Sequence, residues 1–445
     1  IRCDNACRVD WNEVCPHTKE EEVFVFGNPP YLGFRLQSEE QKQDMDNTFG
    51  GVFPSYRKMD YISQWFYKGT MYIYMTKAKC AFVSTNSVTQ GEHIALLWKQ
   101  ILSYVEINFA YTSFKWVNNA KHNAGVICVI VGLANINSDM KVIYTDDKRI
   151  ETKVIAPSLS LAQRILVEKS NVCLSGFPSI RLGNMPNDNT ILRLDRTERD
   201  NILSTYPNSM RLFKRFVGSV ELINSVERYC LWISDADKEF AYSIPPIKEK
   251  FDKVFSYRIN SKDINLNKQA EKPYQFREFV SSSAQTLVIP IVSSALRKYI
   301  PMAFVDESAV VPNSAFMIND ASLLIFGILT SRQHMVWVLQ NAGRLKNDFR
   351  YSTKLCYNTF PFPSISSSKK SEIEEAATDI LLVRAEYPDK TLADLYDPDK
   401  MPRDLLEAHE KLDLIVESCY PGSPFPNDEA RLECLFKLYE KMTAK

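Results

Sequence analysis

A short hydrophobic run that ends in two prolines constrains the fold of this chain more than any other feature. The stretch EEVFVFGNPPYLGF begins at residue 21. Val23–Phe26 has the β-branched and aromatic composition of a strand, and Pro29 and Pro30 cannot donate to a sheet, so the strand must stop before them. The prolines also fix φ in the segment that follows. A strand therefore ends here in a stiff loop that carries Asn28 and Tyr31.

The first third of the chain alternates between strand-like and helix-like segments. We expect strands at Val23–Phe26, Cys80–Thr85, Val105–Ala110 and Gly125–Val131, and helices at Glu39–Asn47, Tyr56–Tyr74 and Gly91–Leu102. Such alternation predicts a parallel sheet covered by helices. Only a short polar loop separates the last two strands, which predicts that they form an antiparallel pair.

Charge is distributed unevenly over the 445 residues, although the net charge is zero. Residues 1–159 carry 17 basic and 17 acidic side chains, residues 160–365 carry 26 and 19, and residues 366–445 carry 11 and 18. A basic middle beside an acidic tail indicates that the middle meets a polyanion.

The last part of the chain reads as helical. The stretch FPFPSISSSKKS, residues 360–371, is expected to be a linker, and Ser371 with Glu374 has the spacing of a capping box. Apolar residues then recur at helical spacing, with His409 on the same face as Leu405 and Leu412, where we expect it to be a core residue.

Several classes of protein are disfavoured. Ten scattered cysteines fit reduced thiols in a cytoplasm, and the spacing of Cys3, Cys7, Cys15 and His17 is too irregular to favour a metal site. No apolar run reaches membrane-spanning length and no secretory signal is recognisable, so no membrane partner is expected. Patterns typical of hydrolases, P-loop proteins and zinc proteases do not occur.

The loop after the first strand has residue types that suit one kind of chemistry. Asn28 offers a side-chain carbonyl oxygen and Pro29 a main-chain carbonyl oxygen, and two converging acceptors can bind both protons of an exocyclic amine. Those hydrogen bonds free the lone pair of the nitrogen, and the positive charge that develops during methyl transfer meets fixed dipoles. Tyr31 offers a flat face on which a base can stack.

Asn-Pro-Pro-Tyr after a strand resembles the catalytic signature of S-adenosylmethionine-dependent amino-methyltransferases, most often N6-adenine DNA methyltransferases. Longer stretches are similar to one branch, the MmeI-like type IIL restriction–modification enzymes. These stretches are DNACRVDW (4–11), SFKWVNNAKHNAGVICVIVGL (113–133), FVGSVELINSVERYCLWI (216–233), YIPMAFVDESAVVPNSAF (299–316), ILTSRQHMVWVLQNAGRLKNDFRYS (328–352) and LADLYDPDKMPRDLLEAHEKLD (392–413). The resemblance covers nearly the whole chain.

This resemblance implies an α/β fold in three parts. Residues 1–159 would be the C-terminal part of a Rossmann-like class I methyltransferase sheet, residues 160–365 an α+β target-recognition domain for double-stranded DNA, and residues 366–445 a helical support domain. The family's glycine-rich cofactor loop and nuclease domain would precede residue 1. We therefore expect a bacterial, cytoplasmic protein whose N-terminal region is missing here and which binds S-adenosylmethionine poorly without it.

The resemblance also implies roles for individual residues. The catalytic loop would comprise Asn28, Pro29, Pro30 and Tyr31. Asn5, Ala6, Asn28 and Asp60 would lie at the cofactor, and Phe114 or Trp116 would pack on the flipped base opposite Tyr31. Candidate DNA contacts are Arg297, Lys298, Arg332, Arg344, Lys346 and Arg350, each more typical of a phosphate contact or a solvated charge than of a base contact.

Three alternatives stay open at this point. Methyltransferases that act on a protein glutamine use the same loop, but they end soon after their antiparallel hairpin, whereas here more than three hundred residues follow Val131. Enzymes that methylate cytosine N4 more often have Ser in place of Asn28. The chain could also be a DNA-specificity module that acts with a separate catalytic part.

Overall fold

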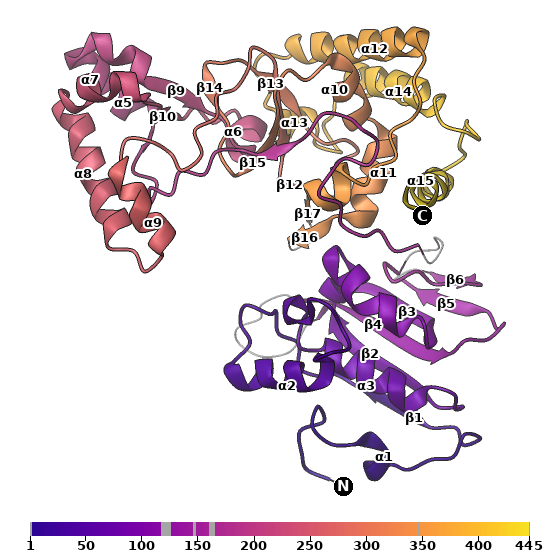
Figure 1. Cartoon of the computed structure of the whole chain (residues 1–445). Helices are drawn as coiled ribbons and strands as arrows, with labels where there is room; N and C mark the ends of the chain where they lie inside the picture. Colours follow the sequence, from indigo (N-terminus) through magenta and orange to yellow (C-terminus); the bar gives the residue numbers. More distant parts are fainter. Residues whose placement is uncertain (1, 117–125, 146–147, 160–164, 346–347, 445) are drawn as a thin grey trace.

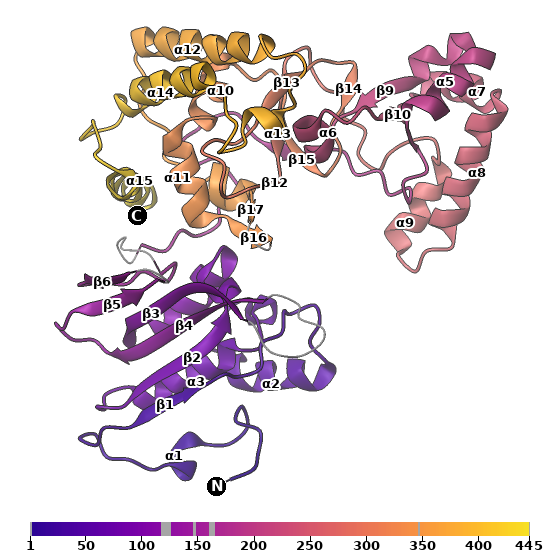
Figure 2. The same cartoon turned by 180° about the vertical axis from the view of Figure 1, so that it is seen from behind.

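The computed structural model describes residues 2–116, 126–145, 148–159, 165–345 and 348–444. Figures 1 and 2 show the residues up to β6 as one body, the C-terminal helices above it, and a lobe that extends away from both and contains α5, α7, α8 and α9, whereas α6 lies beside α13 and β11 (we call this lobe, without α6, the α5–α9 lobe). Both views show an open side of the molecule between α2 and α9. None of the described helices combines the length and the apolar composition needed to cross a membrane.

The N-terminal body is built on a six-stranded sheet in the order β1-β2-β4-β3-β5-β6. Its strands are β1 (Phe24–Gly27), β2 (Lys79–Thr85), β3 (Val105–Trp116), β4 (Val126–Asn135), β5 (Lys141–Tyr144) and β6 (Arg149–Thr152). β1 and β2 pair in parallel, as do β3 and β5, whereas β4 and β6 run the other way. The predicted antiparallel pair of β3 and β4 is confirmed, and both strands are longer than expected.

Helices α2 (Glu39–Phe49) and α3 (Ser63–Ile73) pack with this sheet, and a π-helical turn (Ile94–Trp98) runs into α4 (Lys99–Ile101). The prediction of one helix over Tyr56–Tyr74 is wrong, because a 3-10 turn (Tyr56–Lys58) and a non-helical stretch with a bend and a turn (59–62) precede α3. Asp60 lies in that stretch with its carboxylate turned to backbone N–H groups, which competes with helix formation. The short helix α1 (Trp11–Val14) lies beside α3.

The middle of the chain contains three small sheets, in the orders β14-β9-β10-β8, β13-β11-β15-β7 and β12-β17-β16. The strands are β7 (Arg181–Leu182), β8 (Arg193–Leu194), β9 (Phe213–Phe216), β10 (Tyr229–Leu231), β11 (Thr286–Pro290), β12 (Val292–Ser293), β13 (Ala303–Val305), β14 (Ala309–Val310), β15 (Ala315–Ile318), β16 (Gly343–Leu345) and β17 (Asp348–Arg350). The helices are α5 (Arg196–Thr205), α6 (Ser219–Asn224), α7 (Lys238–Tyr242), α8 (Pro245–Ile259), α9 (Ile264–Lys268), α10 (Leu323–Leu329) and α11 (Arg332–Asn341). The α+β prediction for this region is confirmed.

The C-terminal helices share a core with part of the middle region. They are α12 (Ser367–Ala385), α13 (Leu392–Leu395), α14 (Arg403–Glu417) and α15 (Asp428–Thr443). Phe326 of α10 and Trp337 of α11 belong to the same buried cluster as Ile380 of α12 and Leu412 of α14. The lobe of α5–α9 has a separate core, in which Phe251 is fully buried. His409 is also fully buried, as predicted.

One arginine ties the lobe together. Arg258 on α8 is 1% exposed and has no carboxylate within salt-bridge distance among the described residues. Its guanidinium donates to five backbone carbonyl oxygens at 2.8–3.0 Å, those of Pro186, Asn187, Gln269, Lys272 and Gln275. The side chain therefore joins the helix to two segments that lie far apart in the sequence, 186–187 and 269–275.

The expected linker at residues 360–371 is wrong. Phe360 and Phe362 are buried in the shared core, and α12 begins at Ser367. The N-cap is Ser366, whose hydroxyl accepts a hydrogen bond from the backbone N–H of Lys369 at 3.2 Å. Ser371 instead lies inside the helix, so it makes no capping box with Glu374. Each serine at 366–368 could act as the N-cap of this helix. The helix begins after the first of them, because Phe360 and Phe362 pack in the core just before it.

Substitutions at the two serines should distinguish these caps. Ser366→Ala is expected to lower the free energy of unfolding by about 1 kcal/mol, because one backbone N–H of the first turn loses its acceptor. Ser371→Ala is the matched control and should cost nothing, because its hydroxyl only donates to the Ser367 carbonyl within the helix. Urea unfolding measures both values, and equal losses would contradict the assigned cap.

A buried histidine in the shared core should make stability depend on pH. His334 is fully buried with its Nε2 2.8 Å from the Tyr351 hydroxyl, and burial lowers the pKa of His334 to about 3. Below pH 6.5 the unfolded chain therefore binds a proton that the folded chain does not, so stability falls as pH falls. This residue alone should lower the free energy of unfolding by about 2 kcal/mol between pH 8 and pH 5.

Urea unfolding at the two pH values checks this expectation. His334→Gln should be less stable than the parent at pH 8, but its free energy of unfolding should fall about 2 kcal/mol less on going to pH 5. An identical fall in both proteins would show that His334 does not cause the pH dependence.

Candidate active site

The loop after β1 lies at the rim where the parallel strands end. β1, β2, β3 and β5 point the same way, so their C-terminal ends share one edge of the sheet, the usual place for a site in an open α/β fold. Asn28 is exposed at this rim, Pro29 behind it is buried, and Tyr31 is partly buried. The Asn28 amide is therefore accessible to a ligand, while the buried Pro29 holds the backbone that follows it.

Asp60 holds the end of the loop. The backbone N–H of Leu32 donates to the Asp60 carboxylate at 2.8 Å, and the N–H of Tyr61 donates to the Leu32 carbonyl at 3.0 Å. The Gln37 side chain donates to the same carbonyl at 3.1 Å. Burial raises the pKa of Asp60, and the hydrogen bonds from backbone N–H groups oppose that rise. The loop is thus fixed by prolines at its start and by these hydrogen bonds at its end.

Tyr31 and Phe114 lie on the same face of the sheet. The Tyr31 hydroxyl is 3.9 Å from the Cys128 sulfur, and Cys128 on β4 pairs directly with Phe114 on β3 and with Thr85 on β2. Directly paired residues in antiparallel strands point to the same face. Burial raises the pKa of Tyr31, so the phenol stays protonated at neutral pH. Trp116 is the last residue of β3, and its side chain lies outside the described part.

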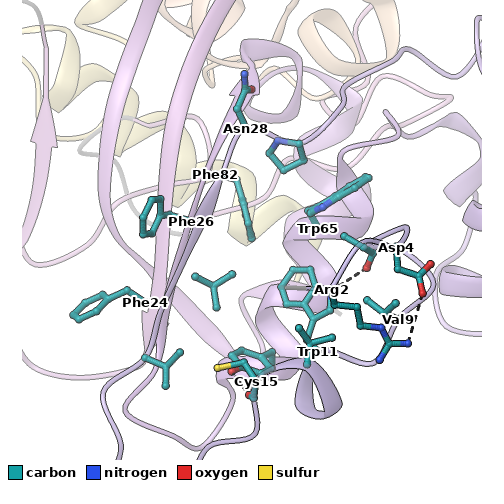
Figure 3. Close-up of a pocket in the computed structure, with 17 residues that line it drawn as sticks. Arg2, Asp4, Val9, Trp11, Cys15, Phe24, Phe26, Asn28, Trp65 and Phe82 are labelled. Atoms are coloured by element: carbon teal, nitrogen blue, oxygen red, sulfur yellow. Dashed lines mark hydrogen bonds and ion pairs between the residues drawn. The ribbon is translucent and has the colours of Figure 1, made fainter.

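A pocket of about 580 Å³, which we call the strand-edge pocket, lies beside β1 (Figure 3). Asn28 lies at one end of it and Trp11 and Cys15 at the other. Its wall is mostly apolar and includes Ala6, Val9, Trp11, Val25, Trp65 and Phe82. A concave wall of this kind, with flat rings and a polar group at one end, suits a ligand with a planar base.

The four residues predicted for the cofactor separate in the structure. Ala6 and Asn28 line the strand-edge pocket, whereas Asn5 and Asp60 do not. The Asn5 amide lies 3.5 Å from the carboxylate of Asp44, which also accepts hydrogen bonds from Arg8 and Tyr61 at 2.8 Å. Burial alone would raise the pKa of Asp44, but these donors lower it overall. Asn5 therefore anchors the N-terminal segment to α2.

A second hollow of about 720 Å³, here called the hairpin cleft, lies on the other side of the loop. One wall is formed by Gly33–Arg35, Lys58, Asp60 and the segment after β2, and the other by Lys169 and the hairpin of β16 and β17. Arg344 and Arg350, two of the predicted DNA contacts, line this cleft. The loop from Asn28 to Arg35 therefore borders one hollow at its start and the other at its end.

The other predicted DNA contacts lie elsewhere. Arg297, Lys298 and Arg332 line a third hollow near α11, α14 and α15. Arg332 forms an ion pair with Asp428, and Lys298 forms one with Glu410 at 2.8 Å. Lys346 lies outside the described residues. Of the five predicted cations that the structure describes, two thus line the cleft beside the proline loop.

Several residues that line the two hollows were not predicted as site residues from the sequence, among them Trp11, Arg35 and Lys58. Trp11 lines the strand-edge pocket, and Arg35 and Lys58 line the hairpin cleft. Arg35 follows the proline loop closely enough for its place beside that loop to be anticipated. Lys58 comes to the cleft only through the bend before α3, for which the sequence gives no local signal.

The mixed sheet, the stiff amide-bearing loop at its rim and the apolar pocket beside that loop fit the fold expected of a methyltransferase domain. In this chain a separate α+β region and a helical region follow that domain. The chain belongs to the MmeI family: residues 1–145 match the family's DNA-methyltransferase domain, residues 161–364 its target recognition domain and residues 365–445 its C-terminal domain.

Two comparisons with known proteins agree with this assignment. The chain is 47% identical over 447 residues to DNA methyltransferase A of Bacillus subtilis (strain 168), an alignment that covers 100% of this chain and 51% of the relative. The structure superimposes on the type IIL restriction–modification enzyme MmeI, solved in complex with DNA, with a TM-score of 0.91 and 37% identity over 99% of this chain and 60% of that one. The chain thus spans about half the length of its curated relative.

Proposed function

We propose that this chain is the base-handling and DNA-recognition part of a site-specific DNA methyltransferase of a restriction–modification system, acting on N6 of an adenine flipped out of the duplex. One observation carries the proposal. The exposed Asn28 amide stands at the rim between the strand-edge pocket and the hairpin cleft, on the loop that also carries Tyr31. Membership of the MmeI family supports it.

The residues of the rim would act as follows. The Asn28 side-chain oxygen and the Pro29 carbonyl accept the two amine protons, which leaves the nitrogen lone pair free to attack. Tyr31 and Phe114 pack on the two faces of the flipped base, because both lie on one face of the sheet at its rim. Pro30 keeps the loop stiff and Asp60 holds its end. No basic side chain is needed, because the proton leaves after the methyl group has been transferred.

S-adenosylmethionine fits the strand-edge pocket as the donor. Val9, Trp11 and Ala6 offer an apolar surface to its adenine ring, and Asn28 marks the end of the pocket that meets the rim. When bound, this molecule supplies an electrophilic methyl group. Asn5 and Asp60 would support the pocket indirectly, through the Asp44 network and through the loop.

The donor site needs a further covering segment. Phe24 and Phe26 on β1 are 59% and 81% exposed, and within the described residues β1 pairs on one side only. The relative is about twice as long as this chain. We propose that another part of the complete protein covers this strand, so that the 445-residue chain alone binds S-adenosylmethionine weakly and methylates nothing. Micromolar binding of S-adenosylmethionine to this chain in calorimetry would contradict that part of the proposal.

Double-stranded DNA in a bacterial cytoplasm is the proposed substrate. Residues 161–364 match a target recognition domain, and a recognition region of this size favours a large substrate over a single protein side chain. Arg344 and Arg350 would contact phosphates beside the target base. Arg297, Lys298 and Arg332 would make weaker contacts, because internal ion pairs neutralise two of them. Lys346, which lies outside the described residues, remains a proposed DNA contact.

Mass spectrometry of modified nucleosides tests the proposed target atom. The complete protein is incubated with S-adenosylmethionine and unmethylated genomic DNA, which is then digested to nucleosides. N6-methyladenine is the expected product. N4-methylcytosine would assign the alternative base, and unmodified DNA would leave the protein-substrate and specificity-module alternatives. Sequence-selective DNA binding by the complete protein without any methylation would leave only the specificity-module alternative.

A further inference from the structure

The residues that line the hairpin cleft carry more positive than negative charge. Five cations border it, Arg35, Lys58, Lys169, Arg344 and Arg350, against the two carboxylates of Asp60 and Glu92. Lys169 forms an ion pair with Glu92, and the Asp60 carboxylate accepts hydrogen bonds from backbone N–H groups. None of the other four cations forms an ion pair among the described residues, although Asp348 on the same hairpin acts electrostatically on Arg344.

These four cations differ from most charges on the described surface. Within the described ranges, no carboxylate lies within 4 Å of Arg35, Lys58, Arg344 or Arg350. By contrast, Arg57 precedes Lys58 directly and donates two hydrogen bonds to Asp46, at 3.0 and 2.8 Å. Unpaired cations gathered around one hollow repel one another, so they favour an anion in the space between them.

The four side chains stand on two facing walls. Arg35 is exposed in a turn closed by the hydrogen bond from the Leu36 N–H to the Gly33 carbonyl at 2.9 Å, and Lys58 is exposed just before Asp60. Arg344 and Arg350 come from the hairpin on the opposite wall. The turn with Arg35 begins two residues after Tyr31, so an anion held here lies next to the catalytic loop.

We propose that Arg35 and Lys58 bind backbone phosphates of the DNA strand that carries the target base, opposite Arg344 and Arg350. The phosphodiester chain would run through the hairpin cleft with two of the four cations on each side. Such contacts carry no sequence information, but they fix where the strand lies relative to Asn28. Arg35 and Lys58 are therefore positioning residues. The inference rests on the proposed DNA substrate and adds the catalytic-domain wall of its binding site.

Salt dependence of DNA binding tests this role directly. Fluorescence anisotropy of this 445-residue chain with a labelled 30-base-pair duplex of mixed sequence gives the binding constant over a range of NaCl concentrations. Loss of one phosphate contact should lower the slope of log K against log salt by about 0.9 and weaken binding about eightfold at about 0.1 M salt. We expect this result for Arg35→Ala and for Lys58→Ala separately. Lys58→Arg should retain the parent slope.

Arg57→Ala is the matched control, because it removes the same charge from the adjacent position while its partner Asp46 lies outside the cleft. Its slope should equal that of the parent. Equal slopes for Lys58→Ala, Arg35→Ala and the parent would overturn the inference and leave the proposed function intact. Equal losses for Lys58→Ala and Arg57→Ala would also overturn it, since they would show only a general effect of net charge. Absence of duplex binding by the parent chain at every salt concentration would instead contradict the proposed function.

Discussion

Replacing Asn28 with alanine in the complete protein is expected to lower the rate of methyl transfer by about a hundredfold to a thousandfold, while the affinity for duplex DNA changes less than about threefold. In the proposed mechanism the amide oxygen is one of two acceptors for the target amine, and loss of a preorganised group of this kind costs about 3–4 kcal/mol of transition-state stabilisation. In the proposed complex, DNA affinity depends instead on phosphate contacts, which other side chains make. Single-turnover methylation and anisotropy measure the two quantities separately.

Asn47→Ala provides the control for this experiment. Asn47 is an exposed asparagine on α2 in the same domain, and it lines neither the strand-edge pocket nor the hairpin cleft. Its variant should methylate at the parent rate. If Asn28→Ala lost DNA affinity in the same proportion as activity, the loop would serve to build the structure and not to activate the amine.

Replacing Arg258 with methionine should unfold the α5–α9 lobe or lower its stability by about 3–5 kcal/mol. Methionine fills much of the space of the arginine stem, but five buried carbonyl oxygens lose their donor at once. Hydrogen–deuterium exchange of the lobe, compared with that of the β1–β6 sheet, measures the effect where it arises. The sheet should exchange as in the parent because its core is separate.

Arg196→Met is the matched substitution in the same lobe. The Arg196 side chain is 68% exposed and pairs with Glu227 at 3.3 Å, a surface contact whose loss should leave exchange unchanged. Arg258→Lys should give protection from exchange between that of Arg258→Met and that of Arg196→Met, because an ammonium has three N–H donors whereas the guanidinium makes five hydrogen bonds. Similar protection in Arg258→Met and Arg196→Met would show that the carbonyl cluster does not hold the lobe together.

Local patterns in the sequence predicted the N-terminal body well. The strand before Asn28 and the three that follow were found because β-branched and aromatic runs alternate with helical stretches, and their order brought the loop to the rim. The small sheets of the middle region could not be predicted in the same way. Their strands are two to five residues long, and β9 pairs with β14 almost a hundred residues later, so no short window contains the pattern.

In the candidate site, too, local features could be predicted from the sequence, whereas contacts between distant residues could not. The stiffness of the loop follows from Pro29 and Pro30, and that was visible in the sequence. The hydrogen bond from Leu32 to Asp60 and the ion pair of Arg332 with Asp428 join residues 28 and 96 positions apart. A charged residue in the sequence gives no sign of whether such a partner exists, so the cations that border the cleft could not be separated from those that are neutralised.

The two cores of the middle region have a consequence for how such proteins diversify. The α5–α9 lobe has its own hydrophobic core. The strands and helices beside it share a hydrophobic core with the C-terminal helices. Mutations that reshape the lobe surface should therefore leave the rim that carries Asn28, and the helices that support it, unchanged in structure. A lineage can try new surfaces on one block while inheriting the other unchanged, and a laboratory graft would best cut the chain at the borders of that lobe.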